Sequence, residues 1–121
     1  MKAIHILMVM IFSIGMGLGQ LLLKFSAQRQ SANIDSPLAV RLVFLFGDWT
    51  FLMGIALYGL LLVYWVWLLT FLPLSRAYPF TILSFLVAAI GGAVFFHESV
   101  SISFIVGLAI IGIGLAVLSI G

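Results

Sequence analysis

Apolar residues run along this chain in four long stretches, and each has about the length of a helix that crosses a membrane. The stretches cover residues 3–23, 49–71, 77–96 and 104–120. A helix needs about 20 apolar residues to cross a hydrocarbon core roughly 30 Å thick, because each residue advances it by about 1.5 Å. The pattern predicts an all-α integral membrane protein, a four-transmembrane-helix bundle forming one domain over residues 1–121.

The segment between the first two stretches, residues 25–48, is the most polar part of the chain. Polar and turn-forming residues fill its middle, which is typical of a loop. After the loop, Leu38–Phe46 is apolar except for Arg41 and is too short to span a bilayer. We interpret it as a helix lying in the membrane interface, with an early extension of the second span as the alternative.

The first stretch follows Lys2, as the apolar core of a signal peptide would. It is as long as a full span and lacks a small-residue cleavage site with a polar flank, so we expect a retained helix. Four spans place both termini on one side of the membrane. Arg76 shares that side with Lys2, while Lys24, Arg29 and Arg41 lie on the other, and this near balance leaves the orientation open.

Composition excludes several classes of function. Hydrophobic residues make up 65% of the chain and charged residues 7%, and the five basic residues are scattered singly, so we expect no nucleic-acid binding. There is no cysteine, and His5 and His97 are too far apart for metal-ligand spacing. The acids Asp35, Asp48 and Glu98 form no set with a serine and a histidine. We therefore expect no catalysis, no metal and no cofactor.

Small residues recur at helical spacing in three of the stretches. Gly15 and Gly19 form a G-x-x-x-G pair, Gly112 and Ala116 form a similar pair in the last stretch, and Gly91 ends a stripe in the third. Such residues let membrane helices approach closely. Four short spans offer few partners for three stripes, so we also predict a dimer.

Polar residues near the ends of the stretches are candidates for binding. Gln20 and Lys24 share one helix face, and Gln20 is expected to be a buried amide that needs a partner. Lys24 has a plain alternative role, which is to extend its ammonium to the headgroups. Arg76 is suited to bidentate phosphate binding, with an interfacial anchor as the alternative.

Three further residues complete the candidate set. Glu98 either starts the turn before the last span or pairs with a cation across the bundle. Trp65 belongs to an aromatic cluster at the end of the second stretch, and Tyr78 neighbours Arg76. These rings form an interfacial belt or line a groove for an apolar or sugar ligand.

Three motifs resemble the drug/metabolite transporter superfamily. Residues 19–26 (GQLLLKFS) are similar to the end of the first helix of small multidrug resistance proteins. Residues 72–79 (LPLSRAYP) look like the loop and start of their third helix. Residues 96–101 (FHESVS), followed by a glycine-rich span, are similar to the last turn and helix of EamA-like domains.

Drug exporters of this superfamily carry a glutamate in the first helix, where this chain has Met16. The motifs are closer to the paired subunits that flip aminoarabinose-phosphoundecaprenol. That resemblance implies a multi-pass flippase of the inner (plasma) membrane that moves a polyprenyl-phosphate-linked sugar as a homodimer or paralogous heterodimer. Arg76 and Lys24 would then contact the phosphate. An exporter of the small multidrug resistance type and a non-transporting accessory subunit are the alternatives.

Overall fold

The chain is almost entirely helical in the computed structural model, which describes residues 3–31 and 35–120, and those two ranges contain no strand. The helices are α1 (Ala3–Gln30), α2 (Leu38–Phe46), α3 (Trp49–Leu69), α4 (Leu74–Ala77), the 3₁₀ helix η2 (Tyr78–Ile82), α5 (Leu83–Phe95) and α6 (Ile102–Ile120). Four segments are long and apolar enough to cross a membrane, namely α1, α3, the run Leu74–Phe95 and α6. The predicted class is confirmed, and this is a multi-pass α-helical membrane protein.

The ends of the helices differ from the expected ones. α1 continues past Lys24 to Gln30, because lysine, glutamine, alanine and arginine all favour a helix and the charge of Lys24 does not interrupt it. The third span begins at Leu74, directly after Pro73, where the missing N–H of proline costs no helical hydrogen bond. The end of an apolar stretch therefore predicts where the membrane span ends, but the helix can continue beyond that point.

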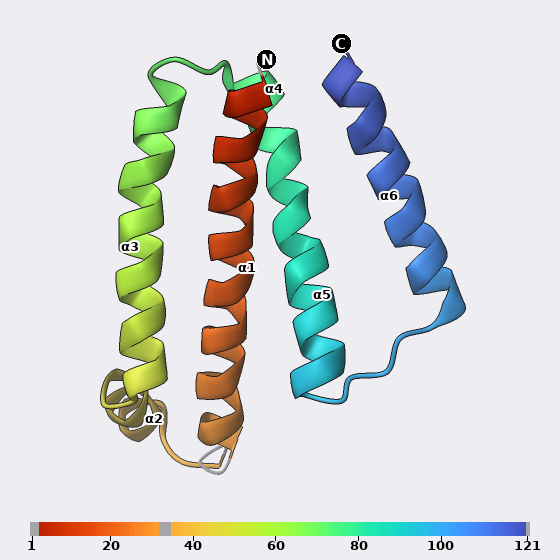
Figure 1. Ribbon diagram of the computed structural model, residues 1–121. Coiled ribbons are helices and arrows are strands. Elements are labelled where there is room, and N and C mark those ends of the chain that lie inside the picture. Colours follow the sequence, from red (N-terminus) through yellow and green to blue (C-terminus); the bar gives the residue numbers. More distant parts are fainter. Residues whose placement is uncertain (1–2, 32–34, 121) are drawn as a thin grey trace.

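Helix α1 lies between α3 and α5 and packs against both (Figure 1). Its glycines permit this approach, since a Cβ on Gly15 would lie 3.0 Å from the Leu61 side chain and a Cβ on Gly19 would lie 3.0 Å from that of Tyr58. On the α5 side, Gly91 lies against Leu21. The buried apolar core contains Val9, Phe12, Leu68, Leu72, Ala77 and Phe80. Two of the three small-residue stripes are thus filled within the chain, and the dimer stays a prediction.

Side-chain hydroxyls join the packed helices. Ser13 is fully buried and donates to the carbonyl oxygen of Phe80 at 3.0 Å, at the 3₁₀ segment where the helical hydrogen-bond ladder is interrupted. Tyr64 on α3 donates to the carbonyl oxygen of Met8 at 2.8 Å. Polar groups in lipid have no water to bind, so these bonds tie α1 to both neighbours.

Helix α6 stands apart from the other three spans (Figure 1). None of its residues is buried, and a Cβ added to Gly107, Gly112 or Gly114 would meet nothing within 4 Å. It contacts the rest of the chain through Leu115, which packs against the core, and through Phe104, whose ring centroid lies 5.9 Å from that of Phe85. Within residues 3–31 and 35–120, no side chain therefore packs against the glycines of α6.

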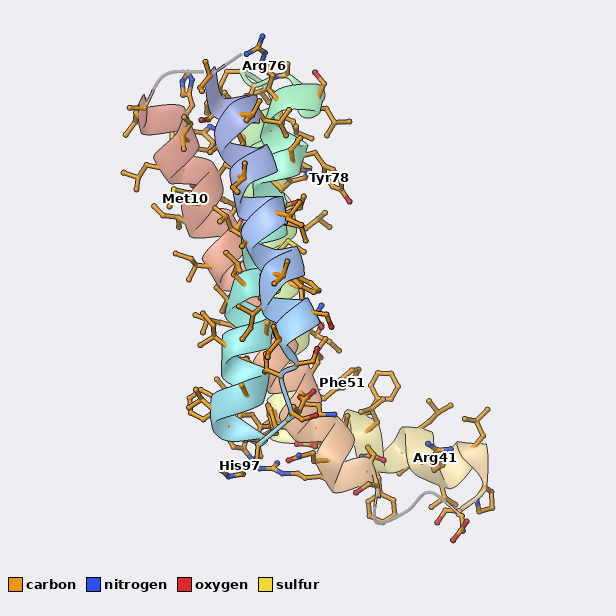
Figure 2. The ribbon with its side chains drawn as sticks, turned by 90° about the vertical axis from the view of Figure 1, so that its right-hand side faces the viewer. Met10, Arg41, Phe51, Arg76, Tyr78 and His97 are labelled. Carbon is orange, nitrogen blue, oxygen red and sulfur yellow. The ribbon has the colours of Figure 1, made fainter. Side chains whose placement is uncertain are left out.

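The short helix α2 lies across the axis of the bundle (Figure 2). It ends at Phe46, and α3 begins anew at Trp49, so α2 is not a continuation of the second span. The corner is held by Asp48, whose Oδ1 accepts from the backbone N–H and the hydroxyl of Thr50 at 3.1 and 2.8 Å and from Arg29 at 2.8 Å. Asp48 thus caps α3 and ties it to the end of α1. The position of α2 in the interface remains a prediction.

These contacts also control the charge of Asp48. Burial opposes ionisation, but the two hydrogen bonds from Thr50, the nearby Ser26 hydroxyl and the charge of Arg29 together outweigh it. The pKa of Asp48 is consequently lowered from its ordinary value of 3.8. The cap and the ion pair are therefore intact at neutral pH.

Candidate functional site

Two cavities lie between α6 and the packed helices. One, of about 300 Å³, is at the end of the bundle that holds both termini, and the other, of about 350 Å³, is at the opposite end. Both take part of their lining from α1, part from the third span and part from α6. Because α6 stands away from the packed helices, one cavity remains at each end of the space between them.

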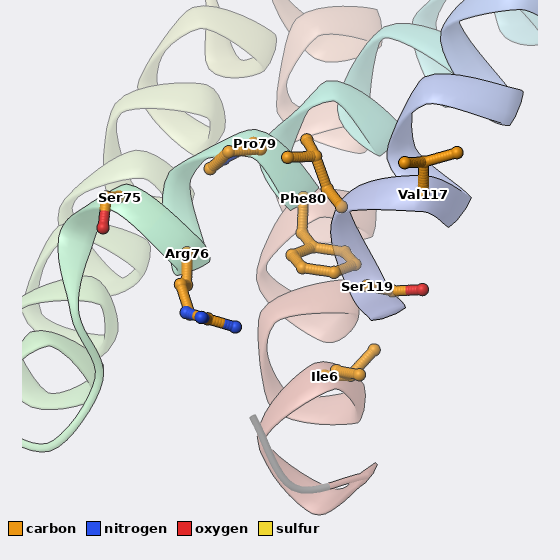
Figure 3. A pocket seen from close by; sticks show the side chains of 8 residues that line it. Ile6, Ser75, Arg76, Pro79, Phe80, Val117 and Ser119 are labelled. Atoms are coloured by element: carbon orange, nitrogen blue, oxygen red, sulfur yellow. The ribbon is translucent and has the colours of Figure 1, made fainter. Parts of the chain in front are cut away.

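Among the described residues, the first cavity combines the guanidinium of Arg76 with mostly apolar walls, and we call it the Arg76 cavity (Figure 3). Its lining residues are Ile6, Ser75, Arg76, Pro79, Phe80, Val117, Leu118 and Ser119. Arg76 sits in the single turn of α4, which begins directly after Pro73 and closes with a bond from the Arg76 N–H to the Pro73 carbonyl oxygen at 3.2 Å. A guanidinium beside aliphatic and aromatic walls suits an amphipathic ligand with an anionic head.

The second cavity holds charges of both signs, and we call it the Lys24–Glu98 cavity. Its lining residues are Gln20, Leu21, Lys24, Phe85, Ala88, Ala89, Gly92, Phe96, Glu98 and Phe104. Lys24 comes from α1 and Glu98 from the connection between α5 and α6. Within the described ranges, the only ion pair is the one between Arg29 and Asp48, so Lys24 and Glu98 face the same space without pairing at 4 Å or less.

The end of α5 places Glu98 in this cavity. The N–H groups of Phe96 and Glu98 both donate to the carbonyl oxygen of Gly92, at 3.1 and 3.2 Å. His97 between them has a φ of 54°, a left-handed conformation that is uncommon outside glycine but less rare for histidine. The turn lays the carboxylate over Gly92, where an added Cβ would lie 2.9 Å from Oε1. Glycine at position 92 thus leaves the space that this carboxylate occupies.

The structure brings together only part of the predicted site. Gln20, Lys24 and Glu98 line one cavity, and Arg76 lines the other, at the far end of the bundle. Trp65 and Tyr78 line neither of them. The Trp65 ring instead stacks on Phe12 at 4.7 Å and meets Tyr78 edge-on at 6.4 Å, on the α3 side of the core.

The expectation for Gln20 is wrong in one respect. It was expected to be buried, but its face of α1 looks toward the space beside α6, and its side chain is exposed. The motifs also gave no sign of Phe85, Phe104 or Ser119 as lining residues. Their place depends on how α6 tilts, and the periodicity of a uniformly apolar helix carries no information about tilt.

The fold and the two cavities define a class, a four-span helical membrane protein with charged groups in cavities on one side of the bundle. Sequence comparison then gives relatives that are each named a probable 4-amino-4-deoxy-L-arabinose-phosphoundecaprenol flippase subunit ArnE. The chain is 36% identical over 66 residues to that of Proteus mirabilis, covering 54% of this chain and 58% of the relative. It is 38% identical over 63 residues to that of Hamiltonella defensa, with coverages of 52% and 55%. It is 40% identical over 57 residues to that of Aeromonas salmonicida, with coverages of 47% and 49%.

The chain thus spans about half the length of the curated relatives it matches. No family model and no solved structure matches it. These similarities confirm the resemblance to the aminoarabinose-phosphoundecaprenol flippase subunits that the motifs indicated.

Proposed function

We propose that this chain is a flippase, or one subunit of a flippase, that moves a polyprenyl-phosphate-linked sugar across the inner membrane. The observation that carries the proposal is the position of two cations in two cavities. Arg76 and Lys24 line cavities at opposite ends of the bundle, on the side of α6. A charged head that crosses the membrane along this side would meet a cation where it enters and another where it leaves.

The energetic cost of moving a charged head through lipid favours an arrangement with a cation at each end of the path. The apolar tail of the cargo stays in lipid at no cost, whereas an unpaired phosphate in the hydrocarbon core costs on the order of tens of kcal/mol by the Born estimate. A protein needs to shield only the head. The cavities offer charge for the phosphate, while the exposed apolar side chains of α6 face the space that the tail would occupy.

A partner chain would complete the path between the two ends. The glycines of α6 have no neighbour within 4 Å among the residues that the structure describes, and the relatives are named as subunits. We therefore expect a homodimer or a paralogous heterodimer. If its two chains have opposite orientations, each side of the membrane receives one Arg76 cavity and one Lys24–Glu98 cavity.

Reconstitution tests the proposal. The full chain, purified with any subunit that accompanies it from native membranes, is placed in liposomes with a polyprenyl-phosphate monosaccharide. Exposure of the sugar on the far leaflet is followed with a membrane-impermeant label. We expect Arg76→Ala and Lys24→Ala each to slow translocation by about tenfold or more, the equivalent of about 1.4 kcal/mol of lost charge-assisted contact.

Arg41→Ala is the matched control, because Arg41 lies on α2 and lines neither cavity. It should translocate at the wild-type rate. Wild-type rates in both cavity variants, or no translocation by the wild-type protein, would contradict the proposed function.

A further inference from the structure

Another cavity lies at the corner where α1 ends and α3 begins, beside the short helix α2, and we call it the Arg29 cavity. Its volume is about 260 Å³, and its lining residues are Arg29, Gln30, Phe44, Gly47, Asp48 and Trp49. It shares no lining residue with the two cavities beside α6, and Figure 1 shows α2 and α6 on opposite sides of α1. The proposed translocation path does not use this corner.

The two charged groups of this cavity differ in exposure. Arg29 Nη1 donates to Asp48 Oδ1 at 2.8 Å, and the side chain of Arg29 is 49% exposed while that of Asp48 is 5% exposed. The same carboxylate oxygen also accepts two hydrogen bonds from Thr50, which hold it inside the corner. A guanidinium carries five N–H donors, and the bond to Asp48 uses one of them. A ligand that enters the cavity therefore meets exposed donors of Arg29, which suits an anion.

The neighbours of Arg29 place its guanidinium at the level of the lipid headgroups. Trp49 is the first residue of α3, a span long and apolar enough to cross the membrane. The guanidinium carbon of Arg29 lies 5.3 Å from the centre of the Trp49 ring. Tryptophan is enriched at the boundary between hydrocarbon and headgroups. At this depth a membrane presents the phosphates of its own lipids, so these are the anions closest to Arg29.

Helix α2 supplies an apolar surface next to the same cavity. It lies across the axis of the bundle, and eight of its nine residues are apolar, with Arg41 as the exception (Figure 2). Its exposed large apolar side chains are Leu38, Val40, Leu42, Val43, Phe44 and Phe46. A short helix of this kind at the end of a membrane bundle is covered by acyl chains, which water cannot replace without cost. Phe44 belongs to both the cavity and this surface, so the two are continuous.

The size of the cavity suits the head of such a lipid. Sites that enclose a whole small molecule have volumes of roughly 300–1,000 Å³. The volume of about 260 Å³ is smaller, so the cavity can hold a head group whose chains remain outside, against α2.

We propose that the Arg29 cavity binds the phosphodiester group of a membrane phospholipid, with Arg29 as its ligand and the acyl chains against α2. This lipid is a bound component of the leaflet beside the corner and not a cargo. It completes the contacts of α2, which packs on the bundle over a small part of its surface. The proposal does not depend on the flippase function, because a lipid held here does not have to cross the membrane.

Binding of two lipids with the same acyl chains tests the proposal. They are phosphatidylglycerol and diacylglycerol, which lacks the phosphate. Their binding to the detergent-purified full chain, with any accompanying subunit, is measured by native mass spectrometry. We expect phosphatidylglycerol to bind at least about tenfold more tightly, because a charge-assisted hydrogen bond to the phosphate is lost in diacylglycerol. Arg29→Gln should weaken phosphatidylglycerol binding to about the level of diacylglycerol.

Two matched variants separate phosphate binding from the structural role of the corner. Asp48→Asn removes the partner charge of Arg29 but keeps a side chain that can cap α3, so phosphatidylglycerol binding should stay or increase. Arg41→Gln changes an arginine that does not line the cavity and should bind phosphatidylglycerol like the wild type. Helical circular dichroism and the elution volume show whether each variant is folded.

Inorganic phosphate distinguishes a lipid from a free anion. Added at the concentration of the lipid, it should not displace phosphatidylglycerol, because it makes no contact with α2. A photoreactive phosphatidylglycerol, with its reactive group near the phosphate, should label the peptide that contains Phe44, and this label should fall in Arg29→Gln.

Four results would overturn the proposal. They are equal binding of the two lipids, unchanged binding in folded Arg29→Gln, an equal loss in Asp48→Asn, and displacement by inorganic phosphate. Lys24→Ala and Arg76→Ala should leave phosphatidylglycerol binding unchanged, since neither residue lines this cavity. If the protein binds phosphatidylglycerol through Arg29 but translocates no lipid-linked sugar, the flippase function fails and the phospholipid site stands.

Discussion

Two regions of the molecule have similar sequences but different packing. They are the packed helices α1, α3 and α5, and the separate helix α6. Both regions are apolar and contain glycines at helical spacing. In the first region, Gly15 and Gly91 lie directly against side chains of neighbouring helices, whereas Gly112 in α6 has nothing within 4 Å. Glycine spacing therefore shows which face of a helix permits close approach, but what fills that face depends on the tertiary structure. In this chain the packed helices form the frame, and the space between them and α6 forms the two cavities.

The strongest test of this difference compares glycines in the two regions. The methyl group of Gly17→Ala would overlap Val87 near its backbone and come within 3.0 Å of the Ser84 carbonyl oxygen, neither of which moves easily. We expect a loss of about 1–3 kcal/mol, the usual cost of overpacking. Thermal unfolding in detergent measures it. Gly112→Ala should leave the stability of the isolated chain unchanged, and equal losses in both variants would contradict the division into a packed and an open region.

A smaller effect is expected at the corner between α1 and α3. Asp48→Ala removes the cap of α3 and the ion pair with Arg29, so its melting temperature at neutral pH should fall by several degrees. Asp35→Ala, at an exposed carboxylate, is the control and should melt like the wild type.

The same corner has a defined pH dependence. The pKa of Asp48 is lowered in the folded state, so its contribution to stability is complete above the ordinary value of 3.8 and is lost as the pH falls through the folded pKa. The difference in melting temperature between the wild type and Asp48→Ala should therefore shrink below about pH 3.8. A difference that stays constant down to pH 2 would exclude this ionisation as the source.

The sequence predicted the spans well because a long apolar run has few other possible structures. It was also sufficient to place Arg76 and Lys24 at opposite ends, since that follows from counting spans. The exposure of Gln20 was not predictable, because it depends on α6 lying away from that face of α1. The placement of Glu98 in the same cavity as Lys24 depends on the left-handed turn at His97, a conformation that is uncommon outside glycine.

The central claim is that the cargo lipid lies in the space between α6 and the packed helices, where the two cavities are. A photoreactive polyprenyl-phosphate monosaccharide, activated in liposomes that contain the full protein, tests it when the labelled peptides are mapped. We predict labelling next to the two cavities, at Phe104 and Val117, that falls when unlabelled cargo is added but persists when ordinary phospholipid is added. Leu60 and Val63 on α3 are the reference, because they are 71% and 70% exposed and line neither cavity. Equal labelling of α3 and α6, or labelling of α6 that cargo does not reduce, would contradict the account.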